Sequence, residues 1–495
     1  MPAGLDFQFS FRPAPRPERR AVSDVFRLLL LGDFSGSGRP APALAGRAPV
    51  PVDVDNFEAV FKRLAPRLTL KLASGAELSP AFASLDDFHA DALYRRLPLF
   101  QTLRDRRARL MDPASFAAAA AERQPAAQGA ESDTATLDRL LGAAPAAAVP
   151  RPASGALAAA GIVDSLLRKA VGAQTVASPS PQREVYLQDV EREMAAQMRA
   201  LLHHPDFQAL EAAWLGLRSL VGSLGGNEEI RLALLDVSRE EIKADLLAAG
   251  GDPQKMGLWT QLVEGGVAAP GGEAWSAIAA NFAFGPGAED LRLLAALGAV
   301  AAGAGAPFLA GAAPTLLGIS SLAAQPDPRD WPGLAPEDAA RWQALRRSAL
   351  APWIGLALPR ILLRLPYGKR GEPVEAFHFE ELEGKFEHEA CLWGSPAFAL
   401  GQLLGLAFLE SGEDMAPDDV TDLEDLPAYV HEMDGERRLL PCAEALLGER
   451  ATDALLSRGL MPILSYRDRN AAKLVRFQSI ADPAAALAGA WGERE

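Results

Sequence analysis

The sequence predicts a mixed α/β protein with two globular halves joined by a disordered linker. Segments with the apolar spacing of helices alternate with short strand-like runs. Hydrophobic residues make up 49% and charged residues 23%, which is typical of globular chains and excludes disorder of the whole chain. Alanine, proline, glycine and serine dominate from about residue 112 to residue 181. We therefore expect globular domains at residues 1–112 and 184–495, and a flexible linker with short helical islands at 113–183.

The first candidate strand is Leu5–Phe11, in which apolar and polar residues alternate. Its apolar face consists of Leu5, Phe7, Phe9 and Phe11. Three prolines between Pro13 and Pro17 follow and form a stiff, extended arm. A strand on such an arm needs a sheet edge, so we expect it to fold back or to pair with a neighbouring subunit.

The rest of the first half contains one more buried strand and several helical patterns. Val25–Leu31 is a continuous apolar run that enters the glycine-rich loop Gly32–Gly38. Asp55–Leu64 has helical apolar spacing, and Leu68–Leu72 alternates like a strand. Ser84–Arg109 is predicted to be a helix, with acidic residues in its first turn and arginines at its end.

Two short islands interrupt the predicted linker, at Thr134–Leu141 and Gly161–Val171. The second has an apolar face at helical spacing, formed by Ile162, Val163, Leu166, Leu167 and Ala170. An amphipathic island in a linker is typical of a docking helix, and an inert linker turn is the alternative interpretation.

In the second half, helical patterns at Val185–His203 and Phe207–Leu220 precede a predicted strand at Ile230–Val237. Ser238 is the expected cap of the next helix. Further strands are expected near Pro307–Ala310, Ile354–Leu358 and Met461–Tyr466. The uncharged stretch Leu293–Gln325 is long enough to span a bilayer, but glycines and prolines break it. A buried helix, strand and loop are the better interpretation.

Charge and cysteine content restrict the class of function. The net charge of −15 argues against a general nucleic-acid-binding protein, which needs clustered basic residues. Two cysteines, Cys391 and Cys442, cannot form a disulfide framework and fit a reducing compartment. The N-terminus lacks the pattern of a secretory signal peptide. We therefore expect a soluble, cytoplasmic protein without direct membrane insertion.

No pattern predicts catalytic, cofactor-binding or metal-binding residues. The Gly32–Gly38 loop resembles a phosphate cradle but lacks the Lys-Ser/Thr of a P-loop, so a tight strand exit is the favoured interpretation. His388 and Cys391 form the closest His/Cys cluster, whereas a structural zinc site needs four ligands.

An acidic run lies between Glu410 and Asp425 and contains no basic residue. It is either a solvated, flexible loop or a surface that meets a basic partner. The hypothesis of an electrostatic interface rests on Asp418, Asp419, Asp422, Glu424 and Asp425.

Motifs of the second half resemble the large subunit (TssC, VipB) of the contractile sheath of type VI secretion. The similar segments keep their order from about residue 185 to residue 482. They are His203–Trp214, Ala306–Phe308, Leu358–Arg360, Arg364–Gly368, Phe377–Glu381, Leu392–Gly394, Asp425–Pro427 and Arg458–Pro462. Gly305 and Leu215 depart from the family, which usually has His and Arg at these positions.

The first half resembles the small sheath subunit (TssB, VipA) over about residues 5–112. The similar segments are Leu31–Gly36, Asp53–Phe57, Leu64–Arg67, Leu85–Phe88 and Leu103–Arg106. The chain thus resembles a fusion of both sheath subunits, with the small one first.

This resemblance implies a structural protein rather than an enzyme, with no cofactor. It implies a helical homopolymer that surrounds an inner tube protein and contracts to drive the tube outward, with separate sheath subunits as further candidate partners. A baseplate and an AAA+ unfoldase for disassembly are the other implied partners, with the unfoldase docking at Ile162, Val163, Leu166 and Leu167. The alternative is a sheath-like adaptor of a baseplate or regulatory complex that does not polymerise.

Overall fold

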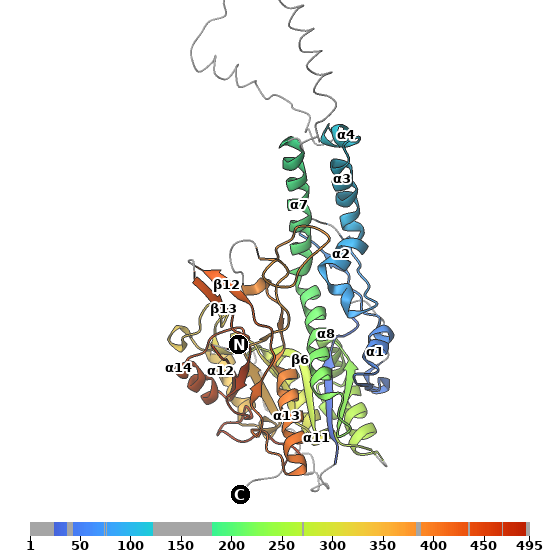
Figure 1. Cartoon of the computed structure of the whole chain (residues 1–495). Helices are drawn as coiled ribbons and strands as arrows, with labels where there is room; N and C mark the ends of the chain where they lie inside the picture. Colours follow the sequence, from blue (N-terminus) through green and yellow to red (C-terminus); the bar gives the residue numbers. More distant parts are fainter. Residues whose placement is uncertain are drawn as a thin grey trace, which may run out of the picture. The chain divides into compact units, whose positions relative to one another are not determined.

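The computed structural model describes residues 24–36, 43–73, 75, 77–121, 181–269, 272–382, 388–433, 436–467 and 469–491 (Figure 1). The chain divides into two compact units. One unit combines Met1–Arg96 with Gln197–Glu495, and the other contains Leu97–Ala196. Helices and strands are mixed along the chain, which confirms the predicted α/β class.

The larger unit contains a nine-stranded sheet in the order β11-β15-β14-β8-β7-β6-β1-β5-β2. Its strands are β1 (Phe26–Gly32), β2 (Val50–Val52), β5 (Ile230–Asp236), β6 (Ala277–Phe284), β7 (Phe308–Ala312), β8 (Ile354–Leu358), β11 (Asp422–Leu423), β14 (Leu460–Ser465) and β15 (Ala472–Leu474). The six strands from β14 to β5 are parallel to one another. Outside them, β2 pairs antiparallel with β5, β15 with β14, and β11 with β15. A parallel sheet of this kind needs helical layers on both faces.

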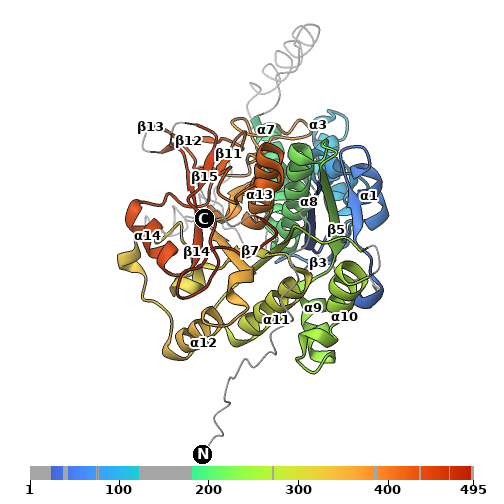
Figure 2. The ribbon, with the colours of Figure 1, turned by 90° about the horizontal axis from the view of Figure 1, so that it is seen from below.

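Helices cover both faces of this sheet, as Figure 2 shows. On one face α8 (Pro205–Leu224) packs against α13 (Pro396–Ser411). On the other face α11 (Ala288–Ala304) lies between α9 (Arg239–Ala248) and α12 (Pro336–Arg346). Shorter helices include α1 (Phe57–Leu64), α2 (Ala90–Arg96), α10 (Gly257–Trp259) and α14 (Glu449–Ser457).

Strand β1 comes from the first half of the sequence but lies inside the sheet. It pairs with β5 along seven residues, from Phe26↔Ile230 to Gly32↔Asp236, and with β6 on its other side. Its leucines are fully buried on both faces. Leu29 belongs to the core beneath α11. Leu28 packs on the other face against Gly401 of α13, where an added Cβ would lie 2.8 Å from Leu28 Cδ2. The predicted buried strand at Val25–Leu31 is confirmed.

The long uncharged stretch folds as predicted into a buried helix, a strand and a turn. These are α11, β7 and a 3-10 turn at Pro314–Leu317. Among the described residues, no helix is long and apolar enough to cross a membrane. The predicted cap is also confirmed, because the Ser238 hydroxyl accepts a hydrogen bond from the Glu241 amide at 3.1 Å and begins α9.

The prediction of one helix over Ser84–Arg109 is wrong. The segment contains a 3-10 turn at Leu85–Phe88, then α2, a second 3-10 turn at Pro98–Phe100, and α3 (Gln101–Met111). Proline removes a helical donor and pushes the residue before it out of the α conformation. Leu97 is accordingly extended, with φ −78° and ψ 132°. The predicted strand at Leu68–Leu72 is the short β3 (Leu70–Lys71), paired with β4 (Glu77–Leu78).

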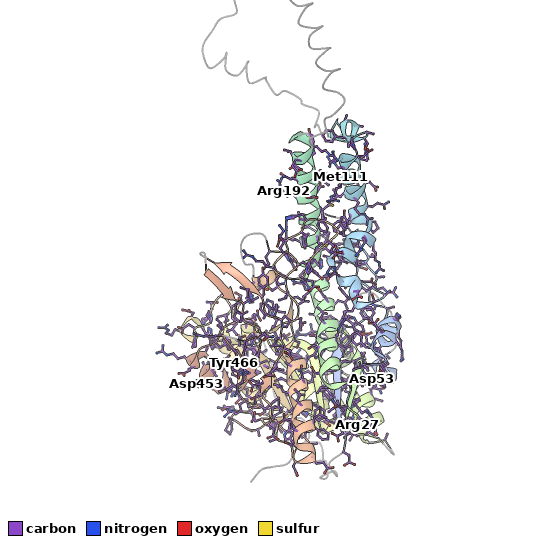
Figure 3. All side chains as sticks on the ribbon, in the orientation of Figure 1. Arg27, Asp53, Met111, Arg192, Asp453 and Tyr466 are labelled. Carbon is purple, nitrogen blue, oxygen red and sulfur yellow. The ribbon has the colours of Figure 1, made fainter. Side chains whose placement is uncertain are left out.

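The smaller unit contains α3, α4 (Phe116–Ala121) and most of α7 (Pro181–Leu202). Figure 3 labels Met111 at the end of α3 and Arg192 on α7. Arg107 Nε donates to Glu191 Oε1 at 3.1 Å, and Arg183 Nε donates to the Leu110 carbonyl at 3.0 Å. The second bond satisfies a carbonyl at the end of α3. Most of the predicted linker, including both islands, lies outside the described residues.

Candidate functional site

The loop after β1 uses its own amides internally. The amides of Phe34 and Ser35 both donate to Asp236 Oδ1, at 2.8 and 3.0 Å, and the Gly36 amide donates to Asp33 Oδ1 at 2.7 Å. A carboxylate of the chain therefore occupies the position in which a phosphate cradle would hold its ligand. In the described part of the loop, this geometry favours the strand-exit interpretation.

Two carboxylates meet where β1 and β5 end. Asp33 follows β1 directly, and Asp236 is the last residue of β5. Burial of Asp33, together with the negative charge of Asp236, raises the pKa of Asp33 to about 6. Asp33 therefore gains its proton at a higher pH than an ordinary aspartate does.

Trp214 of α8, in the second half of the chain, binds the same loop. Its indole Nε1 donates to the Phe34 carbonyl at 2.8 Å in a buried position. The rings of Phe34, Phe57 and Phe61 surround the indole at centroid distances of 5.5, 5.8 and 4.3 Å. This aromatic cluster joins β1 and α1 to α8, so the loop is a structural joint between the two halves.

His388, Glu389 and Glu444 bring potential metal ligands within 4.8 Å of one another. Arg360 already pairs with Glu444, through Nε–Oε2 at 2.8 Å and Nη2–Oε1 at 2.6 Å. It also lies 3.5 Å from Glu389 Oε2. The guanidinium supplies the positive charge that a metal ion would supply. The neighbouring Cys391 does not join this group: it is buried in a small apolar core, and burial raises the pKa of its thiol to about 12.

A buried ionic cluster was not anticipated from the sequence. Arg364 Nε donates to Glu211 Oε1 at 2.7 Å, and Arg364 Nη1 donates to Glu381 Oε2 at 2.8 Å. Both glutamate residues are 1% exposed. All three residues belong to the motifs quoted above, but they come from distant segments. The available signal was Glu211 itself, an acidic residue that stands among the apolar residues of its helix.

Burial and pairing act in opposite directions on the two glutamates. Burial raises the pKa of Glu211, and Arg364 offsets only part of this effect. Burial alone would also raise the pKa of Glu381, but Arg364, His203 and the Tyr367 amide lower it to about 2. Glu381 is therefore the ionised partner of the pair, whereas Glu211 is the one that favours its protonated form.

Asp418 and Asp419 of the acidic run have partners within the chain. Asp418 Oδ1 accepts from the Phe477 amide at 2.6 Å, and Asp419 Oδ2 accepts from the Ala416 amide at 2.8 Å. These bonds fix the segment locally, so this part of the run is not a free loop.

The end of the run faces an arginine. Asp422 pairs with the hydroxyl of Tyr466, labelled in Figure 3, and lies 3.5 Å from Arg469 Nη2. Glu424 Oε1 lies 3.7 Å from Arg469 Nη1. Asp425 has a positive φ of 55°. The structure thus brings members of the run together beside the short edge strand β11 and its neighbour β15, and the role of the run as an interface stays a prediction.

The remaining predicted site residues lie outside the described part of the chain. They are Leu5, Phe7, Phe9 and Phe11 of the N-terminal strand, and Ile162, Val163, Leu166 and Leu167 of the second island. Their roles stay predictions.

Comparison with protein families gives two matches along the chain. Residues 184–481 match the family model for the tail sheath N-terminal domain of EvpB/VC_A0108, named VipB, which covers more than half of the chain. Residues 8–143 match the model described as type VI secretion system, VipA, VC_A0107 or Hcp2. The chain belongs to the type VI secretion sheath family.

The sheath family also supplies a curated relative. The chain is 29% identical over 310 residues to the type VI secretion system sheath protein TssC1 of Pseudomonas aeruginosa. The alignment covers 60% of this chain and 60% of the relative, so the chain spans well under two thirds of that protein's length. The VipA and VipB matches in one chain confirm the predicted fusion of small and large sheath subunits.

The two sheath-family matches are interleaved in the fold. Strand β1 lies in the VipA match, whereas β5 and β6 on either side of it lie in the VipB match. The Trp214 cluster joins the same two parts. The sheath family's two components therefore share one sheet and one core in this chain.

Replacing Gly36 with alanine tests whether the strand-exit loop is a structural joint. Gly36 has φ +74°, and a Cβ there would stand 2.1 Å from the Arg67 carbonyl oxygen. A left-handed alanine costs about 1–2 kcal/mol before any clash, so we expect a loss of at least roughly 2 kcal/mol and a clearly lower melting temperature. Gly46→Ala is the matched control, because nothing lies within 4 Å of that Cβ position. Equal melting of both variants would contradict the assignment.

Proposed function

We propose that the chain is the structural subunit of a type VI secretion sheath that polymerises helically around an inner tube and contracts to drive the tube outward. The observation that carries the proposal is β1, which pairs on both sides with strands of the large-subunit match. One chain therefore holds the joined small and large components of a sheath. The proposal includes no catalytic residue.

Polymerisation along a helix requires interfaces between unlike surfaces of identical subunits. Contraction further requires those interfaces to have two stable packings. The proposed partners are further copies of this chain, an inner tube protein, a baseplate and, as a further candidate, separate sheath subunits. Negative-stain microscopy of the purified full chain tests this directly. Tubes would support the proposal of a sheath subunit. Uniformly dispersed particles under all assembly conditions would support the alternative, a sheath-like adaptor that does not polymerise.

Deleting Met1–Arg12 tests the N-terminal strand as an inter-subunit connection. We propose that Leu5–Phe11 adds to the sheet of a neighbouring copy, because strand addition supplies backbone hydrogen bonds without a new domain. The edge strands of the large sheet are β2 and β11, and both are short. We expect the deleted chain to keep its melting temperature and to lose tube formation in micrographs. The Gln8→Ser variant changes the polar face only and should form tubes; normal tubes from the deletion would refute the connection.

Charge reversal tests the acidic run as an interface. Asp418 and Asp419 bond to backbone amides, so the better positions are the exposed Glu410 and Glu424. We expect Glu410→Lys with Glu424→Lys to impair tube formation, and wild-type assembly to weaken with salt, because exposed charges are screened beyond roughly 8–10 Å. Monomer melting should move little. The control is Glu337→Lys, whose side chain is 84% exposed. Assembly that does not change across a salt series would contradict the interface hypothesis and indicate that the run is a solvated surface.

The second island is the proposed docking helix for an AAA+ unfoldase that disassembles the sheath. Its apolar face includes Leu166, whereas Asp164 belongs to its polar side. We expect Leu166→Asp to reduce binding of the unfoldase of the same secretion system by at least tenfold in an anisotropy titration, with tube formation intact. Asp164→Ala should bind normally. An unchanged dissociation constant for Leu166→Asp would remove the hypothesis.

A further inference from the structure

An irregular segment at residues 363–382 contacts α2 and α8 at separate points; we refer to it as the strap. Asp91 of α2 accepts hydrogen bonds from the Glu375 and Ala376 amides at 3.1 and 2.9 Å. The ring of Phe377 stacks on Tyr94 of α2 at 4.7 Å. The strap also has backbone bonds, such as that from the Leu363 amide to the Leu392 carbonyl at 3.0 Å, but it forms no regular ladder, so the side-chain anchors contribute to keeping it closed.

The most deeply buried anchor is ionic. Arg364 at the start of the strap and Glu381 near its end bind each other, and Arg364 also binds Glu211 of α8. The Arg364 side chain is 11% exposed, and those of Glu211 and Glu381 are 1% and 0% exposed. One guanidinium and two carboxylates would leave a net negative charge in the interior. An unbalanced buried charge is costly, so the cluster favours taking up one proton.

The hydrogen bonds identify which carboxyl carries that proton. Glu381 accepts from Arg364 and from the Tyr367 amide at 2.7 Å, and its Oε1 lies 3.5 Å from His203 Nε2. These donors stabilise its charged form. Within the described chain, the hydrogen-bond donor of Glu211 is Arg364 alone, through the 2.7 Å bond to Oε1 and a longer 3.4 Å contact to Oε2. Glu211 is therefore the less stabilised carboxylate.

We infer that Glu211 holds a proton in the closed structure and that loss of this proton loosens the strap, which makes the cluster a pH-sensitive latch. The raised pKa of Glu211, which is caused by its burial, agrees with this assignment. The groups that face the cluster come from several elements. They are His203 after α7, Tyr367 and Glu372 in the strap, and Cys391 before α13. The inference concerns the folded chain and does not depend on polymerisation.

The direction of the pH effect follows from the raised pKa. A group that binds its proton more tightly in the closed state stabilises that state fully below the pKa of its open form. The ordinary value for Glu211 is 4.5, so stabilisation is complete below about pH 4.5. As the pH rises above that value, the closed state loses up to tenfold in its equilibrium constant per pH unit, until the pKa of the closed form is passed.

Hydrogen exchange of the full chain tests the latch. Strap peptides are followed by mass spectrometry between pH 5 and pH 9, with the intrinsic pH dependence of exchange divided out. We expect protection of residues 363–382 in the wild type to fall as the pH rises, whereas peptides from α11 (Ala288–Ala304) stay unchanged. Glu211→Gln keeps a neutral acceptor for Arg364. Its strap protection should be independent of pH and should exceed the wild-type protection at high pH.

Three variants distinguish the titration of Glu211 from the titration of other groups. Glu381→Gln should lower strap protection at every pH, because it removes the ionised partner of Arg364. His203→Gln should keep the wild-type pH dependence, and a dependence that disappears with His203 instead of Glu211 would overturn the proposal. Asp33→Asn is the control for a carboxyl with a raised pKa outside the strap, and it should leave the strap profile unchanged.

A second measurement on the wild type does not depend on how well a variant folds. Infrared difference spectra in heavy water should show the carbonyl stretch of a protonated carboxylic acid that titrates with strap protection. Assignment to Glu211 follows if the band is missing in Glu211→Gln and present in Asp33→Asn. Absence of such a band in the wild type, or a pH dependence retained by Glu211→Gln, would overturn the latch.

Discussion

The structure of the larger unit depends on the pairing of β1 between β5 and β6. Without β1 these two strands are not neighbours, and the sheet divides into one part that ends at β6 and another formed by β5 and β2. Leu28–Leu31 are fully buried, and burial of each leucine contributes up to about 1.5–3 kcal/mol. Neither subunit component can therefore complete its core alone. The Trp214 cluster and the Asp236 contacts then fix the loop that leaves the strand.

A covalent connection changes how these components associate. The chain between Ala121 and Pro181 links them, so pairing of β1 is an intramolecular event rather than a bimolecular one. Formation of the shared sheet is then independent of protein concentration and fixes the ratio of small to large components at one to one. Protein concentration affects only the association of complete chains with one another.

Local patterns in the sequence predicted the longer strands of the sheet other than β6, and several helices, because burial and capping leave periodic signals. The continuous apolar run of β1 and the Ser238 cap are examples. The break at Pro98 was missed because apolar residues at helical spacing continue on both sides of it, at Leu93, Leu97, Phe100 and Leu103. Strand β6 was also missed, since its alanine-rich sequence lacks alternation.

Local sequence patterns could not predict which residues contact each other across the fold. Arg364 and Glu211 are 153 positions apart, and each looks like an ordinary member of its own segment. The position of β1 inside the sheet is a property of pairing, not of its residues. The family resemblance predicted that both components are present, and the structure adds how they interlock. The carboxylates of the acidic run likewise gained partners, such as Phe477 and Arg469, that sequence proximity did not indicate.

The position of β1 inside the sheet also has a consequence for biosynthesis. The Phe34 amide and Asp236, which meet at the end of the strand, are 202 positions apart. Ribosomes add roughly 5–20 residues per second, so the finished strand waits on the order of 10–40 s before β5 emerges. During that interval four consecutive leucines lack both of their neighbouring strands. Exposed apolar segments of this kind are those that chaperones bind in nascent chains, and the rate of translation sets how long these leucines stay unpaired.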